Sequence, residues 1–560
     1  MYPTQDMGRR GSPRAHQIRQ AAAPIGGLNT KDSLAAMPST DCPALINWIP
    51  DVGGLRSRDG FIEWAVDFPD ALPIRSILAY FGPDAGFPAG TFLTLPTTMP
   101  GEVFAATDDE IYDVTSATNT PGSVKTLSGA EYAGHLSHTM LVNSGGSFLL
   151  VCSETDGYFY YNGTSWVTPI QGPGAGEIDN VDPADFVHVN VWKKRTWFVE
   201  RDSTRAWYLP AEAITGAASV FDFGPLFKRG GHLAFLANWT LDAGEGIDDF
   251  LVAVSSNGDV IIYQGTDPDS ASTFSLVGSW YVGQIPIGRR GYAQLGGDLL
   301  LLSTEGVFPV SEITRGGDAF LAAGGRYSEK IKPSLGKSVR SSFTQYGWQL
   351  AVHSTQRLLV ASTPDTDNSA NFQYVLSTSV NGWTTFNNIP ALCLGPVSGY
   401  MMSGTSDGRV LLLAGSNDSV TYNELDGESI RGVVQFAFNA FEAPSQEKKF
   451  LMVRPSFLAA LDPGLVVDVS VNYTFEQLQG AVPNPNALNS TEWDGSSSDP
   501  YDLWNTGYWD GVPGERALFF ADWRTVSGLG FSGAANMTTR VTAPTLLTSM
   551  DYMYQVGGPF

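Results

Sequence analysis

The sequence predicts an all-β protein with a β-propeller-like core, additional β-rich modules and few helices. Three observations lead to this prediction: hairpin patterns recur along the chain, their spacing is regular over a long stretch, and convincing amphipathic helices are scarce. The 61 glycines and 34 prolines are scattered between short β-branched and aromatic runs, which is typical of all-β proteins. At 560 residues the chain is too long for one ordinary core, so we expect several domains or one large repeated architecture.

The hairpin pattern consists of an apolar run, a polar turn and a second apolar or aromatic run. It occurs at 102–115, 147–167, 248–265, 297–311, 372–386 and 400–415. Turns such as Asn257-Gly258 and Asp407-Gly408 place Asn or Asp before Gly, and this order supplies the positive φ angles of tight hairpin turns. Each segment therefore predicts a β-hairpin.

The spacing of these turns favours a propeller. Asp109 and Gly157 lie 48 residues apart, as do Gly258 and Gly306, and Gly157 to Gly258 covers 101 residues, about two periods. A period of ~40–50 residues that carries hairpins is typical of propeller blades, which stack around an axis because each blade leaves two faces to be covered. Beyond Gly306 the rhythm breaks, which we attribute to insertions at the rim. We expect six blades within residues 101–429, with an array of two-sheet sandwiches as the structural alternative.

The N-terminal end differs from the rest of the chain. Residues 1–23 predict a flexible basic arm, because Arg9, Arg10, Arg14 and Arg19 stand among residues with little apolar surface to bury. Such an arm becomes ordered when it lies on an acidic neighbour, so these arginines are candidates for docking on another protein.

Two further regions flank the predicted propeller. Residues 24–100 are expected to pack on the core as an N-terminal segment. Residues 430–560 predict a separate β-rich module, because 430–442 and 464–475 read as long alternating strands. After them, 484–511 forms a loop rich in Trp and Asp, and a closing strand ends the module.

Charge argues against a nucleic-acid-binding surface. The net charge is −24 and the pI is near 4.5, so the surface repels a polyanion and sequence-specific DNA binding is not expected. Such repulsion suits a conduit, because an acidic wall does not bind the DNA that moves along it. Only 16% of the residues are charged, against ~25% in ordinary soluble domains, which favours a component of an assembly.

Cysteine usage and hydropathy argue against a disulfide-bonded, a membrane-inserted or a secreted protein. Cys42, Cys152 and Cys393 are far apart and odd in number, so we expect buried free thiols and no disulfide. No segment reaches the ~18 uninterrupted apolar residues of a membrane helix, so membrane insertion by this chain is not expected. The N-terminus lacks the apolar core of a secretion signal.

The sequence predicts no enzyme: no catalytic, cofactor-binding or metal-binding residue is assigned. No nucleophile elbow, Walker loop or dinucleotide fingerprint is present. His135 and His138 stand three apart without a carboxylate or thiol at ligand spacing, and on a strand such positions face opposite sides. A glycosidase needs two carboxylates across a cleft, which spacing alone does not test. A propeller glycosidase or lectin acting on host surface polysaccharide therefore stays as an alternative.

Tryptophans gather near the C-terminus, where Trp493, Trp504, Trp509 and Trp523 fall within 31 residues. Such rings stack on sugars in lectins, anchor protein interfaces or fill cores. We rank core or interface packing first and sugar binding last.

Both ends of the chain carry short sequence motifs. The opening segment 24–61 carries Gly27-Leu28-Asn29, the Asn47-Trp48-Ile49-Pro50 box and Leu55-Arg56-x-Arg58-x-Gly60. The closing segment carries the Trp-Asp doublets, Val526-Ser527-Gly528-Leu529-Gly530 and Asp551-Tyr552-x-Tyr554-x-Val556-Gly557-Gly558. In these motifs the chain resembles the tail nozzle (tail tubular or stabilisation) proteins of short-tailed phages, the podoviruses. The middle of the chain matches only in its hairpin rhythm.

This resemblance implies a structural virion protein without a cofactor. It implies a homo-hexameric ring at the distal end of the tail, below the adaptor (the head-to-tail connector protein), with tail fibres or spikes attached outside and assembly in the host cytoplasm. The lumen would continue the channel for genome retention and ejection, with non-specific passage of double-stranded DNA. Six copies at −24 each would carry −144. A receptor-binding or fibre adaptor of the tail is a second alternative.

The resemblance also selects residues for attention. The candidates for subunit-interface contact or packing are Trp48, Ile49, Pro50, Arg56, Arg58, Trp493, Trp504, Trp509, Tyr552 and Tyr554. Because Pro50 pushes the residue before it out of the helical region, Trp48 and Ile49 are expected to form an extended apolar plug. We further expect segments 24–61 and 540–560 to pack near one another, since the termini of one domain usually lie close.

Overall fold

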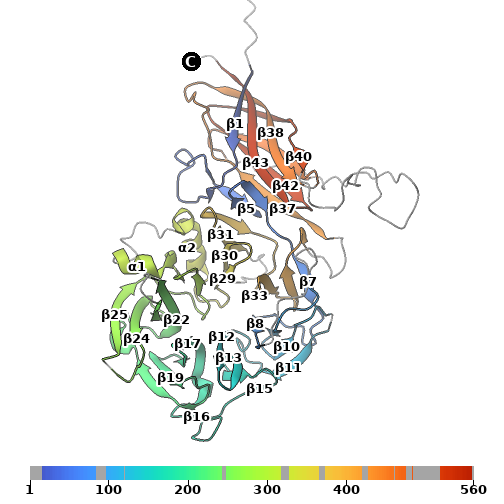
Figure 1. The fold of residues 1–560 in the computed structure, drawn as a ribbon. Coiled ribbons are helices and arrows are strands. Elements are labelled where there is room, and N and C mark those ends of the chain that lie inside the picture. The colour runs from blue at the N-terminus through green and yellow to red at the C-terminus, as the bar shows by residue number, and fades with distance from the viewer. Residues whose placement is uncertain are drawn as a thin grey trace, which may run out of the picture. The chain divides into compact units, whose positions relative to one another are not determined.

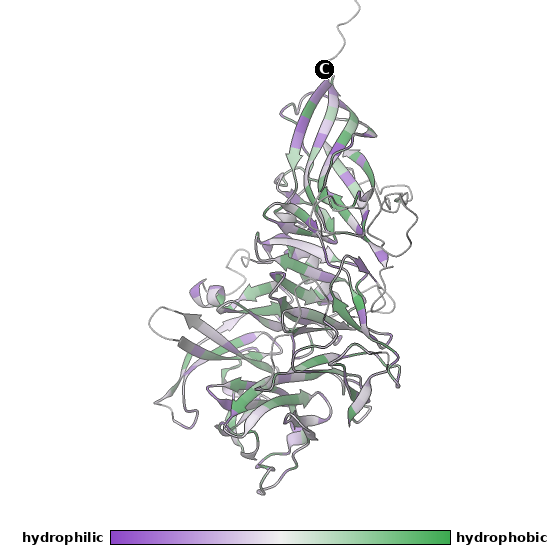
Figure 2. Cartoon of the chain, turned by 45° about the vertical axis from the view of Figure 1, so that its right-hand side comes forward, coloured by the Kyte–Doolittle hydropathy of each residue, from purple (hydrophilic) through white to green (hydrophobic). Residues whose placement is uncertain are grey.

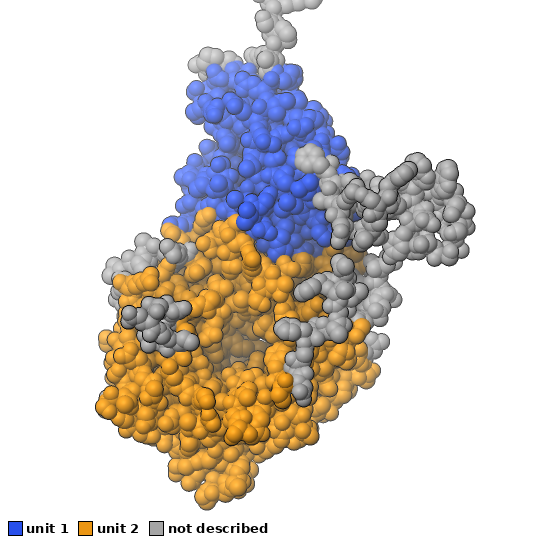
Figure 3. Space-filling view, in the orientation of Figure 1, with its two compact units in different colours: residues 1–58, 429–560 blue, residues 59–428 orange. Residues whose placement is uncertain are grey.

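The structure is a computed structural model in which the chain divides into two compact units. Unit 1 contains residues 1–58 and 429–560, and unit 2 contains residues 59–428 (Figure 3). The residues described are 16–83, 96–118, 120–242, 247–270, 272–316, 327–364, 372–418, 427–459, 461–474, 482 and 518–557.

Unit 2 is a β-propeller whose sheets are numbered here as blades in chain order. Blades 1 to 4 each contain four antiparallel strands, given from the centre outward. Blade 1 contains β8 (Ser76–Tyr80), β9 (Glu102–Ala106), β10 (Glu110–Asp113) and β11 (Gly122–Thr126), and blade 2 contains β12 (Leu136–Asn143), β13 (Gly146–Ser153), β14 (Gly157–Tyr161) and β15 (Trp166–Val167). Blade 3 contains β17 (Phe186–Trp192), β18 (Arg195–Glu200), β19 (Arg205–Ala211) and β21 (Ser219–Asp222). Blade 4 contains β22 (Leu233–Asp242), β23 (Ile247–Ser255), β24 (Asp259–Gly265) and β25 (Phe274–Tyr281).

Blades 5 to 7 complete the ring, which Figure 1 shows running from β8 around to β33. Blade 5 has three strands and the others have four. Blade 5 contains β26 (Tyr292–Leu295), β27 (Asp298–Ser303) and β28 (Gly306–Pro309). Blade 6 contains β29 (Gln349–His353), β30 (Leu358–Ser362), β31 (Gln373–Ser377) and β32 (Gly382–Phe386). Blade 7 contains β33 (Cys393–Val397), β34 (Tyr400–Gly404), β35 (Val410–Leu413) and β7 (Ile62–Ala65).

The ring is closed by the first strand of unit 2. Strand β7 lies before blade 1 in the chain but pairs antiparallel with β35 of blade 7, with Ala65 opposite Val410. Its Trp64 is 1% exposed and donates from Nε1 to the carbonyl oxygen of Val114 in blade 1 at 2.7 Å. One short strand therefore joins the last blade to the first.

The all-β, propeller-based fold class is confirmed, but the number of blades is seven in the described residues and not six. All six hairpin segments form antiparallel strand pairs. The missed blade is blade 3, whose hairpins contain no Asn-Gly or Asp-Gly turn. Its chain reversals place Lys193, Lys194 and Asp202 at φ angles of 49°, 60° and 49°, so the glycine signal is absent where the geometry still needs positive φ.

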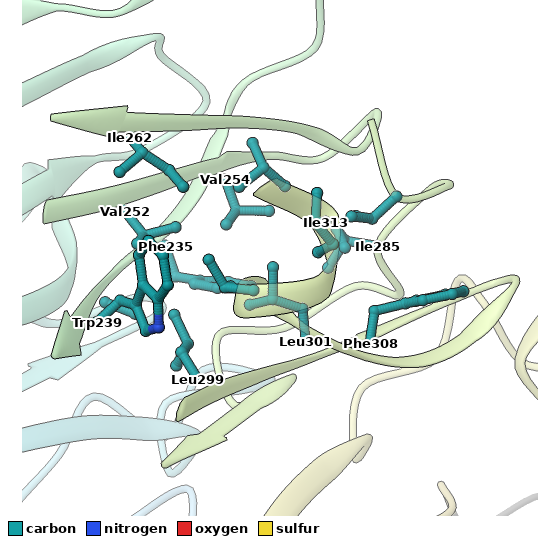
Figure 4. Packing of buried hydrophobic residues seen from close by; sticks show 14 of the residues in the cluster. Phe235, Trp239, Val252, Val254, Ile262, Ile285, Leu299, Leu301, Phe308 and Ile313 are labelled. Carbon is teal, nitrogen blue, oxygen red and sulfur yellow. The ribbon is translucent and has the colours of Figure 1, made fainter. Parts of the chain in front are cut away.

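The core of the propeller lies in layers between neighbouring blades. Between blades 4 and 5, Figure 4 shows Phe235 and Trp239 of blade 4 beside Leu301 and Leu299 of blade 5, and Val254 and Phe308 belong to the same cluster. Equivalent layers lie between blades 7 and 1, 1 and 2, 2 and 3, and 3 and 4. Each strand face is thus covered by the next blade, which explains why the hydrophobic colour concentrates in the strands of this unit (Figure 2).

Helices are few, and one takes the place of a strand. Helix α1 (Val310–Gly316) follows β28 of blade 5 and buries Val310 and Ile313 in the layer against blade 4. The remaining short elements are α2 (Lys332–Ser341), η1 (Pro183–Asp185), η2 (Gly224–Leu226), η3 (Glu329–Ile331), β16 (Ile178–Asp179), β20 (Gly216–Ala217) and β36 (Asn417–Asp418).

Unit 1 consists of β-sheets whose long strands show alternating green and purple bands in Figure 2. In the first sheet, β43 lies between β38 and β6. The strands of this sheet are β40 (Leu518–Phe520), β38 (Lys448–Ala459), β43 (Thr545–Val556), β6 (Gly54–Ser57), β5 (Trp48–Asp51), β1 (His16–Ala22) and β41 (Arg524–Gly530). The other strands of unit 1 are β4 (Ala44–Ile46), β37 (Glu428–Gln435), β42 (Gly533–Val541), β39 (Gly464–Val471), β2 (Gly27–Leu28) and β3 (Asp41–Cys42).

Aromatic side chains fill the space between the sheets of unit 1. Trp48 of β5 lies against Gly432 of β37, where a Cβ would come within 2.3 Å of the indole nitrogen. Phe450 of β38 lies against Gly533 of β42 in the same way, also at 2.3 Å. Both glycines are needed because no other residue leaves room for the rings.

The predicted boundaries need correction at the N-terminal side. The second division, after residue 428, lies next to the predicted start of the C-terminal module, but the first falls after residue 58. The described part of 59–100 supplies β7 and β8, so it forms strands of the propeller instead of a segment packed on it. These strands have no hairpin partner nearby in the sequence, so the hairpin pattern did not include them.

The arm predicted over residues 1–23 also needs correction. Residues His16–Ala22 form β1, which pairs with β43 along its whole length, from His16 opposite Gln555 to Ala22 opposite Ser549. The strand is mostly exposed, so its backbone hydrogen bonds hold it and its side chains bury little. Arg9, Arg10 and Arg14 lie outside the described residues.

The two terminal segments pack together, as predicted. Leu55 and Arg56 of β6 stand opposite Leu547 and Leu546 of β43, so 24–61 and 540–560 share a sheet. The Asn47–Pro50 box leads into β5, which pairs with β6.

Candidate functional site in the propeller channel

A polar cavity lies in the channel along the propeller axis. A cavity of about 300 Å³ is lined by the first strands of blades 1, 2, 5, 6 and 7. Figure 3 shows unit 2 hollowed near its middle. The polar side chains that line the cavity are Ser76, His138, Arg290, Tyr292, Gln294 and Gln349.

One end of this channel is crossed by an ion pair. Arg289, just before the first strand of blade 5, donates from Nε to Oε1 of Glu154 at 2.9 Å and from Nη2 to Oε2 at 3.4 Å. Glu154 lies in a turn of blade 2, and blades 2 and 5 are three positions apart in a ring of seven. The side chains of the pair are only 9% and 7% exposed. The bond therefore spans the channel and ties opposite sides of the ring together.

Aromatic rings cross the channel beside this ion pair. Tyr132, in the connection between blades 1 and 2, stacks on Tyr346, in the connection between blades 5 and 6, with centroids 4.3 Å apart. His135 lies against both rings, at 5.7 Å and 5.2 Å. Together with the Arg289–Glu154 pair these rings plug that end of the channel, and we call this set the channel plug.

Arg290 is the cation of the cavity that has no carboxylate partner among the described residues. Its Nη1 donates to the carbonyl oxygen of Arg75 at 3.0 Å and lies 3.4 Å from Oγ of Ser76, and its Nη2 lies 3.2 Å from Nδ1 of His135. By contrast, Arg75 is paired with Asp108 at 3.3 Å. Burial lowers the pKa of Arg290, but a guanidinium stays charged in a protein.

Three histidines around the channel are held neutral. Burial, followed by the charge of Arg290, lowers the pKa of His138 to about 4 and that of His135 well below its ordinary value. Burial and then Arg289 lower the pKa of His188 to about 3. His135 and His188 are buried, whereas His138 is exposed on β12, so the protein encloses only the first two imidazoles. The nearby guanidiniums disfavour a second positive charge on all three.

Neutral polar contacts continue the belt around the axis. Nε2 of His188 lies 3.2 Å from the Tyr292 hydroxyl, linking blades 3 and 5. Asn190 donates to the side chain of Asn238 at 2.8 Å, linking blades 3 and 4. Such contacts satisfy groups on the inner strands that no neighbouring strand reaches.

The described residues contain no cluster of three or more His, Cys, Asp or Glu that would hold a metal ion. His135 is engaged with Arg290, and His138 faces the cavity on strand β12. Asp108 binds Arg75 and accepts from the backbone of Gly134 at 2.9 Å. In the part of the chain that is described, no helix is long and apolar enough to span a bilayer. The free cysteines are buried, as expected.

The residues selected by the family resemblance lie elsewhere, in unit 1. Trp48, Ile49 and Arg58 are 1–2% exposed, and Tyr552 and Tyr554 are 2% and 0% exposed, so their burial makes them packing residues of this unit. Pro50 is buried beside them in β5, and Arg56 is half-buried and 3.5 Å from Asp51. Arg19 forms an exposed pair with Glu442 at 2.9 Å. Trp493, Trp504 and Trp509 lie outside the described residues.

Sequence reasoning missed Arg289 and Arg290. A signal was present: they are adjacent cations flanked by Gly288 and Gly291 in a long stretch, 231–314, that has no other Lys or Arg. What the sequence lacks is any indication that this pair reaches across the ring to blades 1 and 2.

No protein-family model matches the sequence, and no curated protein matches it. Among solved structures the chain is similar to Saccharomyces cerevisiae Sqt1, with 12% identity over 68% of this chain and 96% of that one and a TM-score of 0.37. It is also similar to the β-propeller domain of Vanderwaltozyma polyspora Nup133 (9% identity, 56% and 90% covered, TM-score 0.29) and to YCF48 from Cyanidioschyzon merolae (9%, 56% and 79%, TM-score 0.24). At these values no function transfers from the neighbours.

Proposed function

We propose that the chain is a structural subunit of a hexameric phage tail nozzle, a ring that continues the DNA channel at the distal end of the tail. The observation that carries this proposal is the pairing of β5 and β6 with β43. The two segments that resemble nozzle proteins stand about 490 positions apart in the chain, yet they are neighbours in one sheet. The resemblance therefore covers one structural module instead of two unrelated stretches.

The channel plug supports an assembled conduit over a single-chain one. The guanidinium of Arg289 reaches Glu154 from the opposite side of the propeller at 2.9 Å, which leaves no width for a nucleic acid duplex. A DNA passage built from this chain therefore has to lie between copies and not along the axis of one propeller. A net charge of −24 per copy suits the wall of such a passage, because it repels the phosphates that slide past it.

The assembled state provides the test. The chain is isolated alone and together with the tail proteins that co-purify with it, and native mass spectrometry counts the copies while electron microscopy images the ring. We expect six copies around an open axial passage with attachment to an adaptor on one face. A ring of another order, or copies that leave no passage, overturns the proposal. Cleavage of a surface polysaccharide by the isolated chain would replace it with the glycosidase alternative.

A further inference from the structure

We propose that the propeller cavity is a binding site for a small anion, a carboxylate or phosphate compound, held by Arg290. This inference concerns one chain and does not depend on ring assembly. The site lies between the inner strands of the propeller, on the cavity side of the channel plug.

One cation of the channel has no carboxylate within ion-pair distance among the described residues. Arg75 and Arg289 each have a carboxylate, Asp108 and Glu154 respectively. Arg290 hydrogen-bonds only to a carbonyl oxygen, a hydroxyl and an imidazole. The carboxylate of Glu154 acts on Arg290 only from beyond ion-pair distance, and it is already bound to Arg289. Because a partly buried guanidinium gains from a direct anionic partner, an anion in the cavity would supply the contact that the chain does not make.

The cavity walls admit an anion. No Asp or Glu is among the seventeen residues that line the cavity, although unit 2 contains 40 acidic residues. Its volume of about 300 Å³ is at the lower end of the range for small-molecule sites. The apolar part of the lining, which includes Ile77, Leu350 and Val397, suits the carbon chain of a di- or tricarboxylate.

His138 supplies a second group for the ligand. Its side chain faces the same cavity as Arg290, and its ring nitrogens make no hydrogen bond within the described residues. A neutral imidazole offers one N–H donor, and an anion placed between it and Arg290 would raise its affinity for a proton. The two side chains thus form a receptor for one anionic group, because a carboxylate or phosphate presents several acceptor oxygens.

Calorimetry on the full chain tests the proposal, with inorganic phosphate, succinate and citrate as separate probes in a low-salt buffer. We expect saturable binding of at least one probe to the natural chain and a rise in its unfolding midpoint. Arg290→Met should weaken binding tenfold or more. The matched control is Arg357→Met, which replaces an exposed arginine in a turn of blade 6, and it should leave affinity within about twofold.

Two milder variants keep the test decisive if Arg290→Met does not fold. Arg290→Lys retains the charge but loses the planar two-nitrogen fork, and His138→Gln removes the imidazole; each should weaken the same probe about two- to tenfold. The relative response to phosphate and to the two carboxylates identifies the ligand chemistry. Absence of binding of all three probes at about 10 mM, or unchanged affinity in both milder variants, overturns the proposal.

Discussion

The two units differ most in charge. Unit 2 contains 40 acidic and 19 basic residues, a formal charge of −21, whereas unit 1 contains 17 and 14, a charge of −3. Almost the whole negative charge of the chain therefore belongs to the propeller. Within the propeller, the cavity reverses this sign, since Arg290 faces it and no carboxylate does. Charge in this molecule differs from one surface to another, and the net value of −24 does not reveal that one unit carries only −3 or that the cavity is cationic.

The units also differ in their aromatic anchors, and the largest expected effect uses a matched pair. Trp64 and Trp48 are both 1% exposed, the first in unit 2 and the second in unit 1. Each Trp→Ala change should cost about 3–5 kcal/mol through lost contacts and the cavity left behind. Reaction of the buried thiols with a maleimide locates the damage. Trp64→Ala should accelerate labelling of Cys393, which shares its core layer, and Trp48→Ala that of Cys42 in unit 1.

Equal acceleration of both cysteines in both variants would show that the two units unfold as one, and the comparison between them would then not extend to stability.

The next effect separates the channel plug from the rest of the propeller. Arg289→Met leaves Glu154 as a buried charge without its partner, and we expect a loss of about 3–5 kcal/mol in urea unfolding. The double change Arg289→Met with Glu154→Leu should recover most of it, because no unpaired charge remains. If the double variant is as unstable as the single one, lost packing across the channel and not the orphaned charge is the cause.

Acid should destabilise the propeller through its buried histidines. Because the pKa of His188 is about 3 in the folded chain and ordinarily ~6.5, the unfolded chain binds the extra proton between these values. The free energy of unfolding therefore keeps the full contribution of His188 above pH ~6.5. It falls as the pH decreases from 6.5 toward 3, by about 1.4 kcal/mol per pH unit for this one group. His188→Gln should reduce the measured slope by one proton.

Tyr292→Phe is the control for that measurement: it removes the hydroxyl bonded to His188 but keeps the imidazole, so the slope should persist. An unchanged slope in His188→Gln would contradict the assignment.

The smallest effect follows from the difference in formal charge between unit 2 (−21) and unit 1 (−3). Raising sodium chloride from about 0.05 to 0.5 M shortens the Debye length from about 14 to 4 Å and screens repulsion on the propeller. We expect its unfolding midpoint to rise by a few degrees at most, with a smaller change for unit 1. Scanning calorimetry at several salt concentrations checks this. Equal shifts of the unfolding midpoint for both units would contradict the expectation that the more highly charged unit responds more strongly to salt.

The sequence predicted the fold where the information is local. Hairpins with Asn-Gly or Asp-Gly turns were found because two neighbouring residues encode the backbone angles of the turn. Blade 3 was missed because Lys193 and Asp202 adopt the same angles without that code. Strand β7 was missed because its partner strand lies some 345 positions further along, from Ala65 to Val410.

The site was not predictable for the same physical reason. Arg289 and Glu154 meet only because seven blades close a ring, and nothing in the residues near either position specifies the number of blades. The buried thiols were predicted from composition and are confirmed. The hexamer, the adaptor contact and the passage of DNA stay predictions.

The pairing of β7 with β35 has a consequence for biosynthesis. The ribosome makes Ile62–Ala65 early and the partner strand 345 positions later, which takes about 20–70 s at ordinary elongation rates. During that interval the nascent chain carries an unclosed ring with exposed strand edges at both of its ends. The outermost strand of the last blade is thus the first strand of the propeller to be translated and among the last to pair. A chaperone that covers exposed strand edges would act during this stage.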